Sequence, residues 1–144
     1  MKVNIVKLKP NAIIPTQGSE YAAGYDLYAC NEQAIAIPPH STIKVGTGIA
    51  IQPPKGYFGA IFARSGLATK NGLRPANCVG VCDEDYTGEY IVALHNDTDN
   101  FQSIAVHERI AQLVFLPYLN VEFEEVDALD ETNRGDGGFG STGK

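Results

Sequence analysis

The sequence predicts an all-β domain, either a sandwich or a barrel, followed by a flexible tail. Short runs rich in Val, Ile, Tyr and Phe recur along the chain, and clusters of Gly, Pro, Asn and Asp separate them at short intervals. The apolar pattern stops near Asp127, where the segment "DALDETNRGDGG" begins. We therefore expect a β domain over residues 1–126 and a tail over residues 127–144.

The apolar runs define the expected strands. In chain order they are "VNIVKL", "AIAI", "TIKVGTGIAIQ", "YFGAIFA", "YIVALHN", "IAQLVFLPYL" and "VEFEEV". Glycines inside "TIKVGTGIAI" indicate a bulge or a close approach of two backbones. The apolar residues around Gly80 in "NCVGVC" predict a tight hairpin. A short helix is expected over residues 65–72, "SGLATKNG", because glycine bounds it.

The last eleven residues, "RGDGGFGSTGK", include five glycines. Glycine loses more backbone entropy on ordering than other residues, so this segment cannot form a stable helix or strand by itself. It nevertheless carries a cation, Arg134, and an aromatic ring, Phe139. A purely flexible tail needs neither, so we expect the tail to take part in function.

Composition limits the class of protein. With 144 residues, a net charge of −6 and no run of Lys or Arg, the chain lacks the basic footprint of a nucleic-acid-binding protein. No apolar run approaches the roughly 20 residues of a membrane span, and polar residues interrupt the N-terminal segment "MKVNIVKLKP". We expect a cytoplasmic protein with no membrane partner. Its three cysteines are expected to be reduced thiols and do not have the spacing of a zinc site.

Two polar segments next to apolar runs are candidates for binding. Asp26, in "AAGYDLYAC", is either a turn-forming residue at a strand end or a carboxylate that holds a metal-bound water. Arg64, Ser65 and Gly66 follow a predicted strand and offer a guanidinium, a hydroxyl and a backbone N–H. This trio suits a phosphate, although a solvated arginine in a surface turn has the same pattern.

Further candidates lie in the second half of the chain. In "NCVGVCDEDYTGEY", Asp83 directly follows an apolar strand and begins a run of three acids. These acids form a solvated loop, or Asp83 is partly desolvated and acts as a general base. In "HERIAQLVF", Arg109 and Gln112 interrupt a strand-like run. They are either polar positions on the outer face of a strand or members of a site.

Five segments stand in order from about residue 20 to the end of the sequence: "AGYDLYA", "RSGLATKNGL", "GVCDEDYTGE", "RIAQL" and "RGDGGFGSTG". Taken together, in this order and at this spacing, they resemble the five motifs of the trimeric dUTP diphosphatase family. The resemblance implies a jelly-roll β-sandwich and a homotrimer whose three active sites are each shared by all three chains. It implies hydrolysis of dUTP to dUMP and pyrophosphate, which limits uracil incorporation into DNA and supplies dUMP for thymidylate synthesis. It also implies Mg²⁺ bound through substrate phosphates and water.

The resemblance further implies a role for each site residue. Asp26 would hold water around Mg²⁺, Asp83 would activate the attacking water, and Tyr86 would pack against the deoxyribose. The phosphate-binding residues would be Arg64, Ser65, Gly66 and Gln112. The deoxyuridine pocket would be lined by Asn77, Gly80 and Val81.

The tail would complete the site from another subunit. Arg134 would bind the γ-phosphate, Phe139 would cover the uracil, and Gly140 and Ser141 would donate hydrogen bonds to the phosphates. A flexible tail can open to admit a nucleotide and then close over it, which excludes water. This implied role explains the cation and the ring in a glycine-rich segment.

Two other functions remain open at this stage. A dCTP deaminase shares the implied fold, but the glycine tail and "DEDYTGE" are of the diphosphatase kind. A non-enzymatic nucleotide-binding module is the second alternative, and the intact Asp83 argues against it. The chain departs from the family pattern at Ala63, where proline is usual, at Cys82, where an aliphatic residue is usual, and at His107, where glycine is common.

Overall fold

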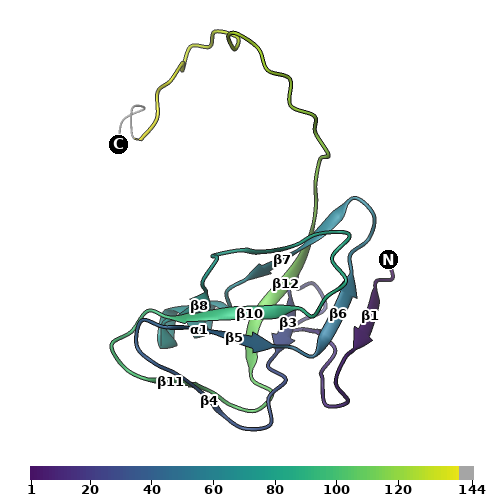
Figure 1. Cartoon of the computed structure of the whole chain (residues 1–144), viewed down its shortest axis with the longest axis vertical. Coiled ribbons are helices and arrows are strands. Elements are labelled where there is room, and N and C mark those ends of the chain that lie inside the picture. The colour runs from purple at the N-terminus through teal and green to yellow at the C-terminus, as the bar shows by residue number, and fades with distance from the viewer. Residues whose placement is uncertain (140–144) are drawn as a thin grey trace.

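The computed structural model describes residues 1–139, which form an antiparallel β protein with one short helix, α1 (Ser65–Asn71) (Figure 1). The largest sheet has the order β2 (Thr16–Gln17), β3 (Tyr25–Tyr28), β12 (Arg109–Pro117), β7 (Tyr57–Phe62) and β9 (Gly80–Cys82). A three-stranded sheet has the order β5 (Thr42–Gly46), β10 (Ile91–Asn96) and β8 (Leu73–Pro75). Two pairs complete the domain: β1 (Asn4–Lys7) with β6 (Ile49–Gln52), and β11 (Gln102–Ile104) with β4 (Ile35–Ile37).

The sheets enclose one hydrophobic core. Leu27 and Leu113 of the five-stranded sheet are buried in the same cluster as Val92 and Leu94 of β10. Along β10 the side chains alternate between buried and more exposed positions, as a strand with one face on a core requires. The all-β class predicted from the sequence is thereby confirmed, and the arrangement of sheets is consistent with the jelly-roll-like sandwich that the resemblance implies.

Two local predictions are also confirmed. The short helix α1 ends at Gly72, whose left-handed φ of 63° caps it. The run over residues 42–52 breaks into β5 and β6 at Gly48, which has a φ of 68°. The backbone N–H of Leu8 donates to the Gly48 carbonyl oxygen at 2.7 Å, and a Cβ at this glycine would lie 2.7 Å from the Sγ of Cys30, so another backbone does approach closely where the run is interrupted.

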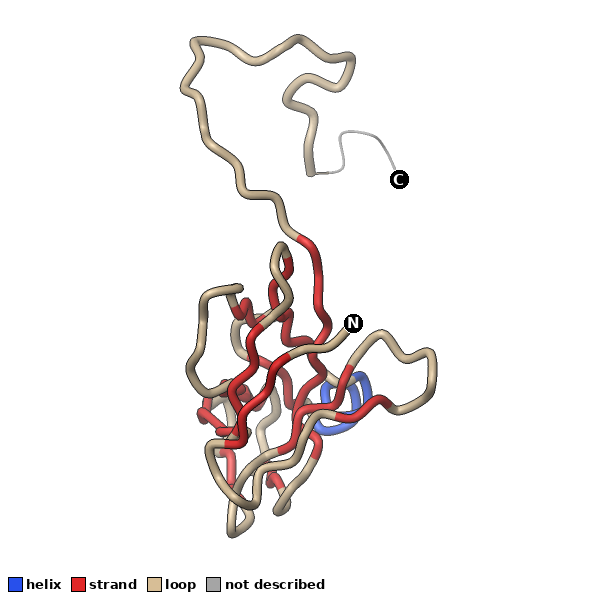
Figure 2. The backbone as a smooth tube through the Cα atoms, turned by 90° about the vertical axis from the view of Figure 1, so that its right-hand side faces the viewer, coloured by secondary structure: helices blue, strands red, loops and turns tan. Residues whose placement is uncertain are grey.

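Two other predictions are wrong. The expected hairpin around Gly80 does not form, because β8 pairs with β10 while β9 pairs with β7. Residues 76–79 therefore cross from one sheet to the other. The run "VEFEEV", residues 121–126, forms no strand, because the segment after β12 leaves the body and has no neighbouring strand to pair with (Figure 2).

The segment after β12 is exposed almost throughout. Over residues 118–139, all but Gly137 are exposed. The strands thus end at Pro117, and the boundary at residue 126 remains a prediction. Within residues 1–139, no helix is long and apolar enough to cross a membrane.

Candidate functional site

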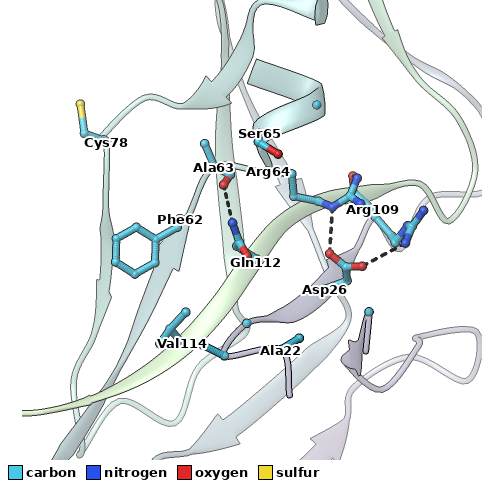
Figure 3. A pocket seen from close by; sticks show the side chains of 14 residues that line it. Ala22, Asp26, Phe62, Ala63, Arg64, Ser65, Cys78, Arg109, Gln112 and Val114 are labelled. Carbon is cyan, nitrogen blue, oxygen red and sulfur yellow. Dashed lines mark hydrogen bonds and ion pairs between the residues drawn. The ribbon is translucent and has the colours of Figure 1, made fainter. Parts of the chain in front are cut away.

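The end of β7 and the start of α1 place Arg64, Ser65 and Gly66 at one rim of a pocket of about 710 Å³ (Figure 3). Arg64 is still extended, with φ −83° and ψ 128°, and the helix begins at the next residue. Leu67 is buried and fixes the helix on the core. Because the first amides of a helix have no intrahelical acceptor, those of Ser65 and Gly66 are available to an anion.

Asp26 bridges two arginines across this pocket. Its Oδ1 accepts a hydrogen bond from Arg64 Nε at 2.8 Å, and its Oδ2 accepts one from Arg109 Nη1 at 3.1 Å (Figure 3). The carboxylate side chain is only 13% exposed, so the two ion pairs are partly shielded from water. Two guanidinium groups and one carboxylate leave one net positive charge for a phosphate.

Arg109 is the residue that the sequence interpretation left without a role. A register shift between Arg109 and Ala111 interrupts the pairing of β12 with β3. A bulge of this kind redirects a side chain, and here it accompanies the contact of Arg109 with Asp26. The sequence signal for a site role was the presence of this arginine in "RIAQL", three residues before Gln112.

Gln112 also lines this pocket. Its Nε2 donates to the carbonyl oxygen of Ala63 at 2.8 Å, so it holds the residue before Arg64 (Figure 3). A Cβ at Gly24 would lie 2.5 Å from Gln112 Oε1, so any larger residue there would displace the Gln112 amide group. The structure therefore brings together the predicted phosphate-binding residues and Asp26 in one pocket.

Asp83 does not line this pocket. It is exposed, directly follows β9, and lines a second open pocket of about 870 Å³ together with Val81. The two pockets share no lining residue. A single chain therefore does not bring the predicted base to the predicted phosphate-binding residues.

The remaining nucleoside-pocket candidates line neither of these two pockets. A Cβ at Gly80 would lie 3.1 Å from the Cβ of Ile61 and 3.5 Å from Asn77 Nδ2, so the chain is tightly packed there. The hydroxyl of Tyr86 donates to the carbonyl oxygen of Glu89 at 2.9 Å, and its ring centroid lies 6.2 Å from that of the fully buried Tyr90.

The three departures from the family pattern, at Ala63, Cys82 and His107, replace none of the candidate site residues. Burial raises the pKa of the Cys82 thiol to about 11, so this cysteine acts as a packing residue rather than as a nucleophile. His107 has a left-handed φ of 56°, which suits the glycine expected at its position. Ala63 supplies the carbonyl that Gln112 binds.

The described part of the tail, residues 127–139, extends away from the body of the chain (Figure 1), and none of its residues lines either pocket. Arg134 Nε donates to the carbonyl oxygen of Gly137 at 2.8 Å, within the tail itself, and Phe139 is fully exposed. Gly140 and Ser141 lie outside the described residues. The structure thus places the tail's cation and ring on a segment that makes no contact with the phosphate pocket.

The side chains of the phosphate pocket suit a metal ion that is bound mainly by water and by substrate phosphates. In the part of the chain that the structure describes, no group of three His, Cys, Asp or Glu side chains could hold an ion. Asp26 is the one carboxylate among the residues that line the phosphate pocket, and both its oxygens already face arginines. Mg²⁺ commonly keeps several waters and binds through substrate phosphates, and these residues fit that mode.

Comparison with known proteins gives the family. The dUTPase family profile matches residues 10–143. Deoxyuridine 5'-triphosphate nucleotidohydrolase of Desulfitobacterium hafniense is 46% identical and covers 99% of this chain and 95% of its own. The corresponding protein of Hydrogenobaculum sp. is 45% identical, with 99% of each chain covered. The structure of the Staphylococcus bacteriophage 80alpha dUTPase with dUPNHPP superposes with a TM-score of 0.89 at 27% identity, over 99% of both chains. Matches that run from end to end, on a fold with this pocket, show that the chain belongs to the dUTPase family.

Proposed function

We propose that this chain hydrolyses dUTP to dUMP and pyrophosphate, in a homotrimer whose active sites combine residues of different subunits. The observation that carries the proposal is the phosphate pocket, which joins Arg64, Ser65, Gly66 and Gln112 to the Asp26 ion pairs. The two relatives described above are both nucleotidohydrolases of deoxyuridine 5'-triphosphate. The phage relative was solved with a deoxyuridine nucleotide bound.

Phosphate binding is assigned to the pocket. Arg64 matches phosphate oxygens in geometry and charge, and the Ser65 hydroxyl and the amides of Ser65 and Gly66 add neutral donors. Gln112 Nε2 holds the Ala63 carbonyl, so it also fixes the backbone just before Arg64. Asp26 would orient water around Mg²⁺, and the ion would add to the neutralisation of the triphosphate when bound.

Water activation is assigned to Asp83. A carboxylate within hydrogen-bond reach of a water can take its proton as the oxygen attacks the α-phosphorus. The pyrophosphate then leaves, and the positive charge of the phosphate pocket stabilises the negative charge that it carries. Since Asp83 and that pocket are separate in one chain, the base of one subunit acts on a nucleotide held by another.

The exposed segment after β12 supports an assembly of several copies. Leu119 is 87% exposed, Phe123 is 94% exposed and Leu129 is 87% exposed. Large apolar side chains on a surface mark an interaction site when they are this numerous and close in the chain. We assign three copies because the motifs resemble those of a trimeric family.

The nucleoside is assigned to the segment around β9. Asn77, Gly80 and Val81 would offer fixed backbone and amide groups to uracil, and Tyr86 would leave no space for a 2′-hydroxyl. A site that hydrogen-bonds one base leaves buried groups unpaired when another base enters, which gives strong discrimination. From the tail, Arg134 would bind the γ-phosphate, Phe139 would cover the base, and Gly140 and Ser141 would donate to the phosphates.

One assay tests the proposal. Pyrophosphate release is measured with dUTP, dTTP, dCTP and UTP, and ammonia release is measured with dCTP. We expect pyrophosphate from dUTP and much slower release from the other three. Ammonia from dCTP would instead indicate a deaminase, and hydrolysis of UTP or dTTP at a rate close to that of dUTP would contradict the pocket assignment.

A further inference from the structure

Glu84, the neighbour of Asp83, connects three segments that are distant in the sequence. Its Oε2 accepts a hydrogen bond from the backbone N–H of Gly56 at 2.7 Å and another from the Tyr118 hydroxyl at 2.8 Å. The backbone N–H of Tyr118 donates to the carbonyl oxygen of Gly56 at 3.2 Å, which closes the set. We call Gly56, Glu84 and Tyr118 the Glu84 clamp.

The clamp joins places that matter to the proposed site. Gly56 forms the turn before β7, the strand that leads to Arg64, and it has a left-handed φ of 80°. Tyr118 is the first residue after β12, where the exposed segment leaves the body. Glu84 and Tyr118 both line the pocket that contains Asp83. A change at any of the three is therefore transmitted to the loop of the proposed base.

The ionisation states favour these hydrogen bonds at neutral pH. The bonds from Gly56 and Tyr118, with a smaller contribution from Lys55, lower the pKa of Glu84 below its ordinary value. The bond to Glu84, followed by burial and by nearby negative charges, raises the pKa of Tyr118. The carboxylate thus stays an acceptor and the hydroxyl a donor, and hydrogen bonds to an ionised group are the stronger kind.

Asp83 itself is held weakly by comparison. Its side chain is exposed, and its backbone carbonyl oxygen accepts a hydrogen bond from the backbone N–H of Tyr86 at 3.1 Å. A base on a loop needs support from its neighbours, because a misplacement of about 1 Å can cost on the order of 100-fold in rate. Within residues 1–139, the Glu84 clamp is the side-chain contact that ties this loop to both β7 and the end of β12.

We infer that Glu84 is a positioning residue, which fixes the Asp83 loop to the turn before β7 and to the root of the exposed segment at Tyr118. The inference rests on the role proposed for Asp83. It makes the placement of the base depend on the hydrogen bonds of Glu84 with Gly56 and Tyr118.

The test compares three variants that each lose one negative charge with one variant that loses only a hydroxyl. Glu84→Ala removes the charge and the acceptor, whereas Glu84→Gln removes the charge but keeps an acceptor oxygen. Asp85→Ala is the matched control, because it removes a charge from the same loop outside the clamp. Tyr118→Phe removes only the donor hydroxyl. Each full-length variant is assayed for kcat and KM with dUTP, for thermal unfolding, and for amide hydrogen exchange.

The clamp gives a specific order of results. We expect Glu84→Ala to lower kcat at least about ten-fold with KM changed less than about two-fold, since the base is displaced while the phosphate pocket is intact. Glu84→Gln and Tyr118→Phe should each lose less than Glu84→Ala, and Asp85→Ala should stay within about two-fold of the parent chain. The Gly56 amide should exchange faster in Glu84→Ala, because its acceptor is gone.

Three results would overturn the inference. The first is a kcat within two-fold of the parent for Glu84→Ala. The second is equal loss in Glu84→Ala, Glu84→Gln and Asp85→Ala, which would make charge alone the cause. The third is unchanged exchange at Gly56. Because exchange is measured without substrate, it tests the clamp even if the parent chain failed to hydrolyse dUTP, so failure of the clamp and failure of the proposed function are distinguishable.

Discussion

Deletion of residues 131–144 should separate stability from activity. In the described part of this segment, residues 131–139, all side chains and backbones except Gly137 are exposed. A segment that buries so little should change the free energy of unfolding by less than about 0.5 kcal/mol when it is removed. Thermal unfolding of the truncated and full-length chains, at equal concentration, checks this first half of the prediction.

The same deletion should reduce turnover strongly. The charge-assisted contact proposed for Arg134 would be worth about 1.5–3 kcal/mol. Stacking of Phe139 on a base would add about 1–3 kcal/mol. At about 1.4 kcal/mol for each factor of ten, their joint loss corresponds to a decrease in kcat/KM of roughly 100- to 10,000-fold.

A mixing experiment then tests whether the site is shared. Truncated chains are combined with full-length chains that carry Asp83→Asn, refolded together, and assayed for pyrophosphate release. Neither parent is active alone, but some mixed trimers would unite an intact Asp83 from one chain with an intact tail from another. The control mixes truncated chains with truncated Asp83→Asn chains, which cannot restore any site. No recovery of activity in mixed trimers verified by mass would refute the shared-site reasoning, even with dUTP hydrolysis established for the parent.

Three further predictions concern single side chains. Asp83→Asn should lower kcat by at least about 100-fold while nucleotide binding persists, and near-normal turnover would remove Asp83 from its role. His107→Gly should raise the free energy of unfolding by about 1 kcal/mol, because relief of the left-handed φ and of the buried, unpartnered Nε2 outweighs the entropy cost of glycine; a lower Tm would contradict this. The hydrogen bond from Arg74 lowers the pKa of Asp97, so its contribution to stability is present above the ordinary carboxyl pKa and is lost as pH falls through the folded value. Asp97→Asn should therefore flatten the dependence of Tm on pH below about 4, and an unchanged slope would oppose it.

Local chemistry in the sequence was sufficient to predict much of the fold. Short runs rich in Val, Ile, Tyr and Phe marked β7, β10 and β12, and glycine marked the end of α1 and the break at Gly48. Pairing partners were harder, since apolar residues around Gly80 look alike whether the flanking strands pair with each other or with distant strands. The run at residues 121–126 has strand-like alternation, but pairing needs a neighbour that a single chain does not supply.

The candidate site was predicted with the same strengths and gaps. Arg64, Ser65 and Gly66 are contiguous, so their association followed from the sequence itself. The contact between Asp26 and Arg109 joins residues 83 positions apart through the pairing of β3 with β12, and sequence spacing does not encode it. No role for Glu84 followed from the sequence, because its partners are defined by the turn before β7 and by the end of β12.

The paired arginines explain how an acidic chain can accept a triphosphate. The net charge of −6 opposes an anion at long range, so attraction has to come from a small region in which positive charge exceeds negative. Asp26 holds Arg64 and Arg109 side by side and prevents their mutual repulsion from separating them, while it cancels only one of their two charges. The Arg64 bond to Asp26 uses Nε, and Nη1 donates a long hydrogen bond of 3.4 Å to the Arg109 carbonyl oxygen, so Nη2 remains to contact a phosphate. In the proposed site, Asp26 would thus orient Arg64 before substrate arrives, and a bound triphosphate would gain the charge of the arginine without first having to order it.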